Sequence, residues 1–127
     1  MTTCLLKVLI STNILLLGQW KNGEMDGEGE LIYSKNDIFA RFLYNGNFKD
    51  GKRSGKGKLF WKNGAKYDGN FENDQRNGFG VCTYSNEDSR DCYEGHWKDG
   101  QISGKGKLVW KNGAKQEGIF ENSSFKH

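Results

Sequence analysis

The sequence predicts an all-β fold, a single elongated, solenoid-like sheet of consecutive antiparallel β-hairpins. Three observations predict it. The 127 residues include 18 Gly and no Pro, aromatic residues make up 13% of the chain, and one pattern of glycines and aromatics recurs along it. Glycine disfavours helix by about 1 kcal/mol per position relative to Ala, and abundant aromatics argue against a disordered chain. The composition therefore favours many turns and thin layers.

The recurring pattern starts at a glycine. An aromatic residue follows at +2, glycines at +5, +9 and +11, an apolar residue at +13 and an aromatic at +15. Four copies begin at Gly18, Gly46, Gly69 and Gly95, and a fifth begins at Gly118. A tyrosine precedes three of these glycines by two positions, at Tyr44, Tyr67 and Tyr93. Such a period indicates a stack of supersecondary units, each contacting only its neighbours.

Each copy predicts a strand, a turn and a second strand. Tyr44, Gly46 and Phe48 are spaced by two and therefore share one face of a strand. The pairs Asp50-Gly51 and Asn63-Gly64 are hairpin-turn signals, because these residue types tolerate positive φ. The glycines on the aromatic face leave space there, and we expect rings of the neighbouring repeat to lie over them.

These boundaries divide the chain into six segments. They are residues 1–17 (a degenerate half repeat or N-terminal cap), 18–43 (repeat 1), 44–66 (repeat 2), 67–92 (repeat 3), 93–115 (repeat 4) and 116–127 (a partial fifth repeat).

The apolar N-terminal segment fits the repeat. Aligning residues 7–18 on residues 58–69 places Leu16 on Tyr67 and Asn13 on the turn residue Gly64. We therefore interpret residues 1–17 as the second half of a degenerate repeat. A capping helix and a signal peptide stay open as alternatives, whereas the apolar run is too short and too interrupted for a membrane span. The half repeats at both ends also leave open that the chain is part of a longer array.

The segment from Tyr93 to Gly106 resembles the signature of the MORN (membrane occupation and recognition nexus) family, with its glycines and aromatics in register. The resemblance covers residues 18–120. Asp74 departs from it where glycine is expected, and insertions precede Tyr44 and Tyr93. The resemblance implies a cytoplasmic scaffold with partners in cytoskeletal, ciliary or membrane-associated assemblies.

The aromatic face carries the predicted function, which is a non-enzymatic scaffold that binds a peptide or helix of a partner protein in an aromatic-lined groove. Packing in the core is the other interpretation of every one of these rings. The predicted groove residues are Tyr44, Phe48, Trp61, Tyr67, Phe71, Tyr93, Trp97 and Trp110.

The opposite face is banded in charge. It carries Lys56, Lys58, Lys105 and Lys107 in two copies, but Glu28 and Glu30 in the first and Phe79 and Val81 in the third. An alternative function is therefore peripheral binding to anionic phospholipid membranes through the Lys-rich bands. A solvated face with ion pairs between neighbouring repeats stays open. The net charge of +3 is too small to predict nucleic-acid binding.

The sequence predicts no catalytic, cofactor or metal site. Residues 51–56 are one residue short of a phosphate-binding loop, and the two histidines, His96 and His127, have no nucleophile implied by spacing. Cys4, Cys82 and Cys92 do not have metal-site spacing, and we expect reduced thiols, with a Cys82–Cys92 disulfide as the alternative. Exposed sheet edges leave edge-to-edge or end-to-end dimers open.

Overall fold

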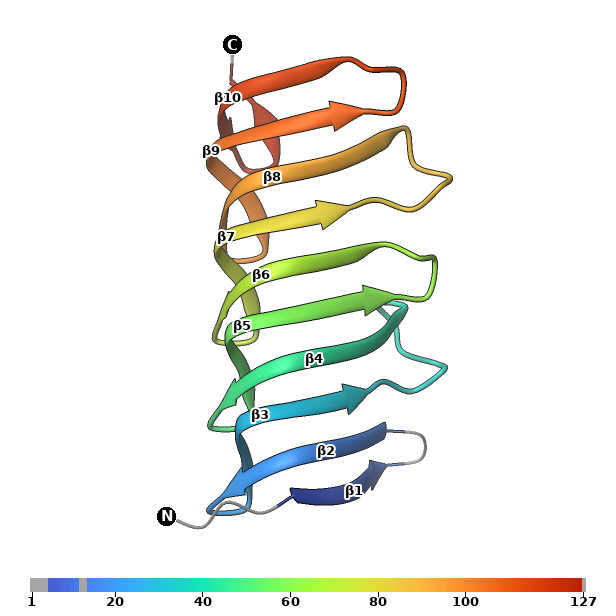
Figure 1. The fold of residues 1–127 in the computed structure, drawn as a ribbon, viewed down its shortest axis with the longest axis vertical. Coiled ribbons are helices and arrows are strands. Elements are labelled where there is room, and N and C mark those ends of the chain that lie inside the picture. Colours follow the sequence, from blue (N-terminus) through green and yellow to red (C-terminus); the bar gives the residue numbers. More distant parts are fainter. Residues whose placement is uncertain (1–4, 12–13, 127) are drawn as a thin grey trace.

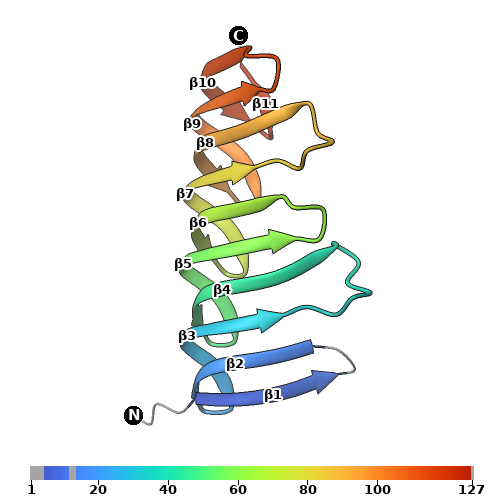
Figure 2. The same cartoon turned by 45° about the vertical axis from the view of Figure 1, so that its right-hand side comes forward.

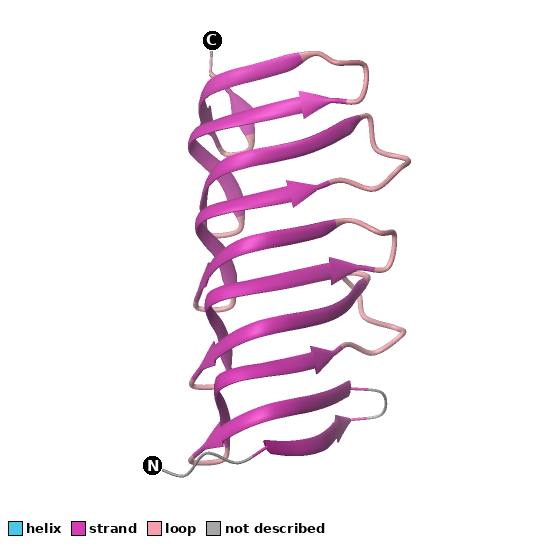
Figure 3. Ribbon diagram, in the orientation of Figure 1, coloured by secondary structure: helices cyan, strands magenta, loops and turns pink. Residues whose placement is uncertain are grey.

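The computed structural model describes residues 5–11 and 14–126, with side chains from residue 16 onward. Eleven strands form one antiparallel sheet in sequence order (Figures 1 and 3). No helix long and apolar enough to cross a membrane occurs in the described part of the chain. The strands are β1 (Leu5–Ser11), β2 (Ile14–Lys21), β3 (Glu24–Ile32), β4 (Arg41–Lys49), β5 (Lys52–Trp61), β6 (Lys66–Glu72), β7 (Gln75–Thr83), β8 (Arg90–Lys98), β9 (Gln101–Trp110), β10 (Lys115–Glu121) and β11 (Ser124–Phe125).

The predicted all-β array of hairpins is confirmed. Two-residue turns join the strands along one side of the stack, and both residues of each turn have positive φ, as in type I′ hairpins. The five turns are Asn22-Gly23, Asp50-Gly51, Asn73-Asp74, Asp99-Gly100 and Asn122-Ser123. From β3 onward, longer loops join the strands on the opposite side, at the right of Figure 1.

The N-terminal segment joins the sheet as strand β1, so its described residues are strand and not helix. The register of β1 with β2 is the same as that of β5 with β6. Val8 lies opposite Leu16, and at the equivalent positions Leu59 lies opposite Tyr67. Residues 1–4 with Cys4, the expected turn at Asn13 and the terminal His127 lie outside the described residues.

A row of glycines crosses the sheet, and we call it the glycine ladder. Each member lies opposite the next across neighbouring strands: Gly18, Gly29, Gly46, Gly57, Gly69, Gly80, Gly95, Gly106 and Gly118. A Cβ on Gly46 would lie 2.4 Å from the Cα of Gly57, so any side chain there would clash. The strands therefore bend sharply at the ladder, and the two-residue turns curl behind the sheet (Figure 2).

Tyrosines cover the glycine ladder from the side toward which the sheet curls, here called the inner face. Tyr44, Tyr67 and Tyr93 are 0% exposed. A Cβ on Gly57 would lie 2.2 Å from the hydroxyl of Tyr44. Tyr44 and Gly57 belong to one repeat, so the expectation that rings of the neighbouring repeat cover the glycines is wrong. The reason is that each tyrosine lies only two residues before a ladder glycine, and its ring extends along its own hairpin.

Each covering tyrosine is anchored by its hydroxyl. The Tyr44 hydroxyl donates to the carbonyl of Asn47 at 2.7 Å, and the Tyr67 hydroxyl donates to that of Asn70 at 2.8 Å. These carbonyls lie where the register between paired strands shifts, directly after the ladder. Burial raises the pKa of Tyr67 to about 12, so this hydroxyl remains a donor throughout the neutral range.

The core is a continuous stack of rings in edge-to-face contact. Tyr44 contacts Phe48 of its own repeat at 5.0 Å between centroids and Phe71 of the next repeat at 5.1 Å. The same alternation continues through Tyr67, Trp97, Tyr93 and Phe120. Each such pair contributes about 0.5–1.5 kcal/mol beyond its buried area. The tyrosines therefore couple repeats 2, 3 and 4 each to the following repeat.

The two-residue turns form a second, narrow layer, which we call the turn wall. Each turn after the first donates one backbone N–H to a carbonyl of the preceding hairpin. The accepting residue lies seven positions after the starting glycine of that preceding repeat. The bonds run from Gly51 to Met25, from Asp74 to Arg53, from Gly100 to Arg76 and from Ser123 to Ile102, at 2.9–3.1 Å. The turn wall folds over the rings, so this thin sheet buries both sides of the stacked rings from Tyr44 to Phe120, while Trp61 and Trp110 remain partly exposed.

Candidate binding groove

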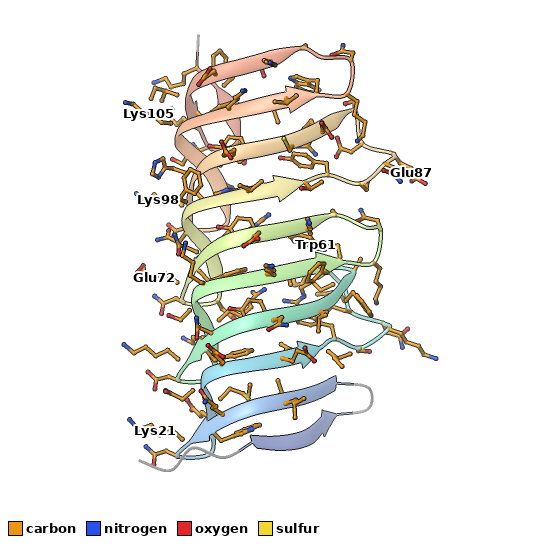
Figure 4. All side chains as sticks on the ribbon, viewed as in Figure 1. Lys21, Trp61, Glu72, Glu87, Lys98 and Lys105 are labelled. Carbon is orange, nitrogen blue, oxygen red and sulfur yellow. The ribbon has the colours of Figure 1, made fainter. Side chains whose placement is uncertain are left out.

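A groove lies between the turn wall and the inner face of the sheet, with a volume of about 230 Å³. Trp61 on β5 lies toward the long-loop end, whereas Lys21, Glu72 and Lys98 beside the short turns lie at the left edge (Figure 4). Three elements supply the lining: the turn wall, the sheet and the loop before β4. The lining residues are Phe39, Arg41, Arg53, Leu59, Trp61, Phe71, Asp74, Gln75, Arg76 and Gly100.

Arg53 lies at the base of this groove with its charge neutralised. Its side chain packs over the ring of Phe71, and the residue is 8% exposed. The guanidinium Nε donates to Asp74 Oδ1 at 2.8 Å, and the Arg53 backbone N–H donates to the same oxygen at 3.0 Å. Burial raises the pKa of the Asp74 carboxyl, but these donors outweigh it and leave the pKa below its usual value.

Arg76 lies at the equivalent place one repeat later, with a different environment. Its guanidinium lies 4.5 Å from the ring centroid of Trp97 and 5.5 Å from that of Trp61. Nη2 donates to the carbonyl of Gly100 at 2.9 Å. Among residues 16–126, no carboxylate forms an ion pair with Arg76. Burial without such a partner lowers the pKa of Arg76 from its usual value.

The loop before β4 closes the groove at its N-terminal side. Arg41 pairs with Asp37 through two side-chain hydrogen bonds of 2.9 and 2.7 Å and lies 4.2 Å above the ring of Tyr33. These contacts hold the loop in place and lower the pKa of Asp37 to about 2, chiefly through the hydrogen bond from the guanidinium. Ile38 and Phe39 next to them are 88% and 62% exposed. An apolar tip therefore stands beside the groove.

Comparison with protein families identifies the repeat. The family model described as MORN repeat matches residues 17–38, 44–66, 67–89 and 93–115, which together cover more than half of the chain. The chain belongs to the MORN repeat family. A comparison with curated proteins found no match.

Most of the predicted groove residues lie in the core of the MORN array. Two of the eight, Trp61 and Trp110, are only partly buried, and of these Trp61 lines the groove. The other six lie in the core at 0–6% exposure, with the buried Phe71 contributing to the groove floor: Tyr44, Phe48, Tyr67, Phe71, Tyr93 and Trp97. Strand periodicity assigns these rings to one face correctly but carries no information about the turn wall that covers them.

Of the ten lining residues, the sequence predicted only Trp61 and Phe71. The residues that it missed include Arg53, Arg76 and Phe39. A signal for the arginines exists, because the residue seven positions after the starting glycine is Met25 in the first MORN repeat and Ile102 in the fourth. Both are buried apolar residues. An arginine at this position is therefore a cation on the inner face. Phe39 lies in an insertion outside the repeat pattern, which gave no indication of its position.

The opposite, outer face carries the predicted lysines. Lys56, Lys58 and Lys105 are exposed, and Lys107 is half-buried. Lys58 lies 4.0 Å from Asp68 on the neighbouring strand, and Lys107 lies opposite Glu94 and Glu117 in the register. Acidic residues therefore alternate with these lysines across the strands.

The sequence singled out two other features, the apolar pair Phe79 and Val81 on the outer face and the cysteine pair Cys82 and Cys92. Phe79 is exposed, and its ring contacts His96 edge-to-face at 5.9 Å between centroids, while Val81 is half-buried. Cys82 and Cys92 are free thiols. Cys82 lies opposite Tyr93 and Cys92 opposite Thr83. Successive residues of a strand alternate between faces, so the two thiols point to opposite sides of the sheet, and the alternative of a disulfide between them is wrong.

Proposed function

We propose that this MORN array is a non-enzymatic scaffold whose groove binds an extended or helical segment of a partner protein. The observation that carries the proposal is the partly exposed indole of Trp61, held between the turn wall and the apolar loop tip at Phe39. Tryptophan and arginine are the residue types that most often dominate binding energy at protein interfaces. The groove offers both on a rigid support.

The rigidity of the groove favours binding. Its floor belongs to the ring stack, and its wall is fixed by the hydrogen bonds from the turns to the preceding hairpins. A preformed site loses little conformational entropy on association. We extend the proposal to localisation: MORN repeats commonly serve scaffold or membrane-binding roles, and we expect this one in cytoplasmic assemblies at the cytoskeleton, cilium or a membrane.

The test replaces Trp61 by alanine and compares the proteins recovered with the wild type and the variant from the native cell. Because Trp61 is only partly buried, we expect Trp61→Ala to keep the wild-type circular dichroism spectrum while losing the specific partner. Phe79→Ala on the outer face is the matched control and should retain that partner. An unchanged set of partners for a folded Trp61→Ala variant would contradict the proposal.

A second candidate is peripheral binding to anionic membranes. Its support is the common outer face of Lys56, Lys58 and Lys105, which are all exposed. Each lysine near an anionic surface contributes roughly 1 kcal/mol. Sedimentation with phosphatidylserine vesicles tests it: binding should disappear in high salt and in a Lys56→Glu/Lys58→Glu variant. Binding that survives both changes would exclude this electrostatic mode.

A further inference from the structure

Arg53 and Arg76 form a natural comparison within one chain. Each accepts a backbone N–H from the following turn on its own carbonyl, and each guanidinium donates to a backbone carbonyl of that turn. The two sites differ in the second turn residue. Asp74 supplies a carboxylate to Arg53, whereas Gly100 supplies no side chain to Arg76.

The groove therefore contains one cation that the described part of the chain does not neutralise. Asp37 pairs with Arg41, and Asp74 pairs with Arg53. Arg76 has five N–H donors, and within residues 16–126 its guanidinium forms a single hydrogen bond, the one to Gly100. The guanidinium of Arg76, with its remaining N–H donors, is held between the rings of Trp61 and Trp97.

We propose that Arg76 binds the carboxylate of a Glu or Asp side chain in the partner's segment, while an apolar neighbour of that residue packs on Trp61 and Phe39. This inference rests on the proposed function and adds its chemistry. Asp74 already shows the ligand that an arginine in this position takes from its own chain. The partner supplies at Arg76 what the turn supplies at Arg53.

A carboxylate fits better than a phosphate. A phosphate monoester carries about −1.5 to −2 charges at neutral pH, but the groove offers one unneutralised guanidinium. A carboxylate balances it and matches the parallel donors of an arginine. The apolar surfaces of Trp61 and Phe39 flank the cation, which suits a peptide with an acidic residue beside a hydrophobic one.

Two variants change the charge at this site with little expected cost to folding. Arg76→Met places at this position the residue that the first repeat buries there as Met25. Gly100→Asp copies the turn of the preceding repeat. Gly100 has φ +84, close to the +71 that Asp74 adopts, and a Cβ on Gly100 would meet nothing within 4 Å. The introduced carboxylate should occupy Arg76 and exclude the partner.

The experiment selects binders of the wild-type protein from a displayed library of random peptides of about a dozen residues. We expect the selected pool to be enriched in Asp or Glu next to an apolar residue. Replacing that acidic residue by Gln or Asn should weaken binding to the wild type roughly 10-fold or more, the size expected for a charge-assisted hydrogen bond. The same replacement should have no effect on binding to Arg76→Met.

Gly100→Asp should bind the acidic peptides roughly 10-fold or more weakly while melting at or above the wild-type temperature. Selected peptides without acidic enrichment, or with equal acid dependence on Arg76→Met, would overturn this inference and leave the groove proposal standing. A pool with no binder, or binders unaffected by Trp61→Ala, would overturn both. Tighter binding of a phosphoserine peptide than of its glutamate counterpart, or binding to phosphatidylserine vesicles lost in Arg76→Met, would overturn the carboxylate assignment.

Discussion

At the residue scale, each covering tyrosine has two roles, one for its ring and one for its hydroxyl. The ring of Tyr67 covers Gly80, and its hydroxyl donates to Asn70. Phenylalanine would fill the same space but would leave that carbonyl without its donor. The family pattern of tyrosine two positions before glycine thus has a physical cause.

We expect Tyr67→Phe to lower the free energy of unfolding by about 1–2 kcal/mol, the cost of leaving a partly buried acceptor without its hydrogen bond. Tyr33→Phe is the matched control, because Tyr33 is buried but its hydroxyl has no hydrogen-bond partner among residues 16–126. Urea denaturation measures both. Equal effects of the two substitutions would show that the hydroxyl of Tyr67 does not anchor the bend.

Asp74 shows how one residue compensates for an unfavourable backbone. It occupies a positive-φ turn position where the other internal repeats have glycine, at a cost of about 1–2 kcal/mol for a residue with a side chain. The ion pair with the buried Arg53 offsets that cost. The sequence marked Asp74 only as a departure from the pattern, because the pairing connects two repeats.

At the element scale, the bend at the glycine ladder makes the groove. Without it the sheet would be flat, and the turn wall could not fold over the rings. Gly57 shows how little space the ladder leaves for a side chain, since its Cα lies under the Tyr44 ring and opposite Gly46 and Gly69.

Gly57→Ala should destabilise the protein by about 3 kcal/mol, because the added methyl group clashes with the Tyr44 ring. Gly64→Ala provides the comparison. Gly64 has φ +94 but open space around it, so we expect a loss of about 1 kcal/mol from the backbone alone. Thermal unfolding of both variants measures the two losses of stability. A loss for Gly57→Ala no larger than that for Gly64→Ala would contradict the role of the ladder.

The two long loops are held by similar ion pairs, Asp37 with Arg41 and Asp88 with Arg90. The guanidinium hydrogen bonds lower the pKa of both carboxyls to about 2. A lowered pKa in the folded state contributes stability that is present above the unfolded value near pH 4 and is lost as pH falls toward about 2. Acid should therefore loosen both loops.

We expect an Asp37→Asn/Asp88→Asn variant to be less stable than the wild type at neutral pH by about 1 kcal/mol per loop, a value reduced for solvent screening because Arg90 is partly exposed. The difference should shrink as pH falls from about 4 to about 2. Urea midpoints across this range give the measurement. A difference independent of pH would show that these carboxylates do not act through their charge.

At the scale of the whole molecule, the stack is quasi-one-dimensional, with each hairpin bonded to its neighbours along the sheet, through the ring stack and through the turn wall. The inner face provides a groove and the outer face a band of alternating charges. The fold thus separates a partly apolar face, where we propose that a partner binds, from a solvated one.

Most of this fold could be predicted from the sequence, because Asp50-Gly51 and its equivalents define the turns and glycine spacing defines the registers. The groove could be predicted only in part. Alternation places Trp61 and Tyr67 on one face, but the bend at the ladder, which decides that Tyr67 is buried and Trp61 partly exposed, depends on contacts between strands. The position of Phe39 depends on the Asp37–Arg41 pair within an insertion and has no counterpart in the repeat pattern.

We propose that the groove, and not the outer face, receives a partner. Site-specific photo-crosslinking in the native cell tests it most directly, with the photoreactive residue at Gln75 in the groove or at Glu94 on the outer face; both are exposed positions. We predict that position 75 crosslinks to a defined polypeptide, that Trp61→Ala abolishes the product, and that position 94 yields none. A defined product from position 94 alone, or one from position 75 that persists in a folded Trp61→Ala variant, would contradict the claim.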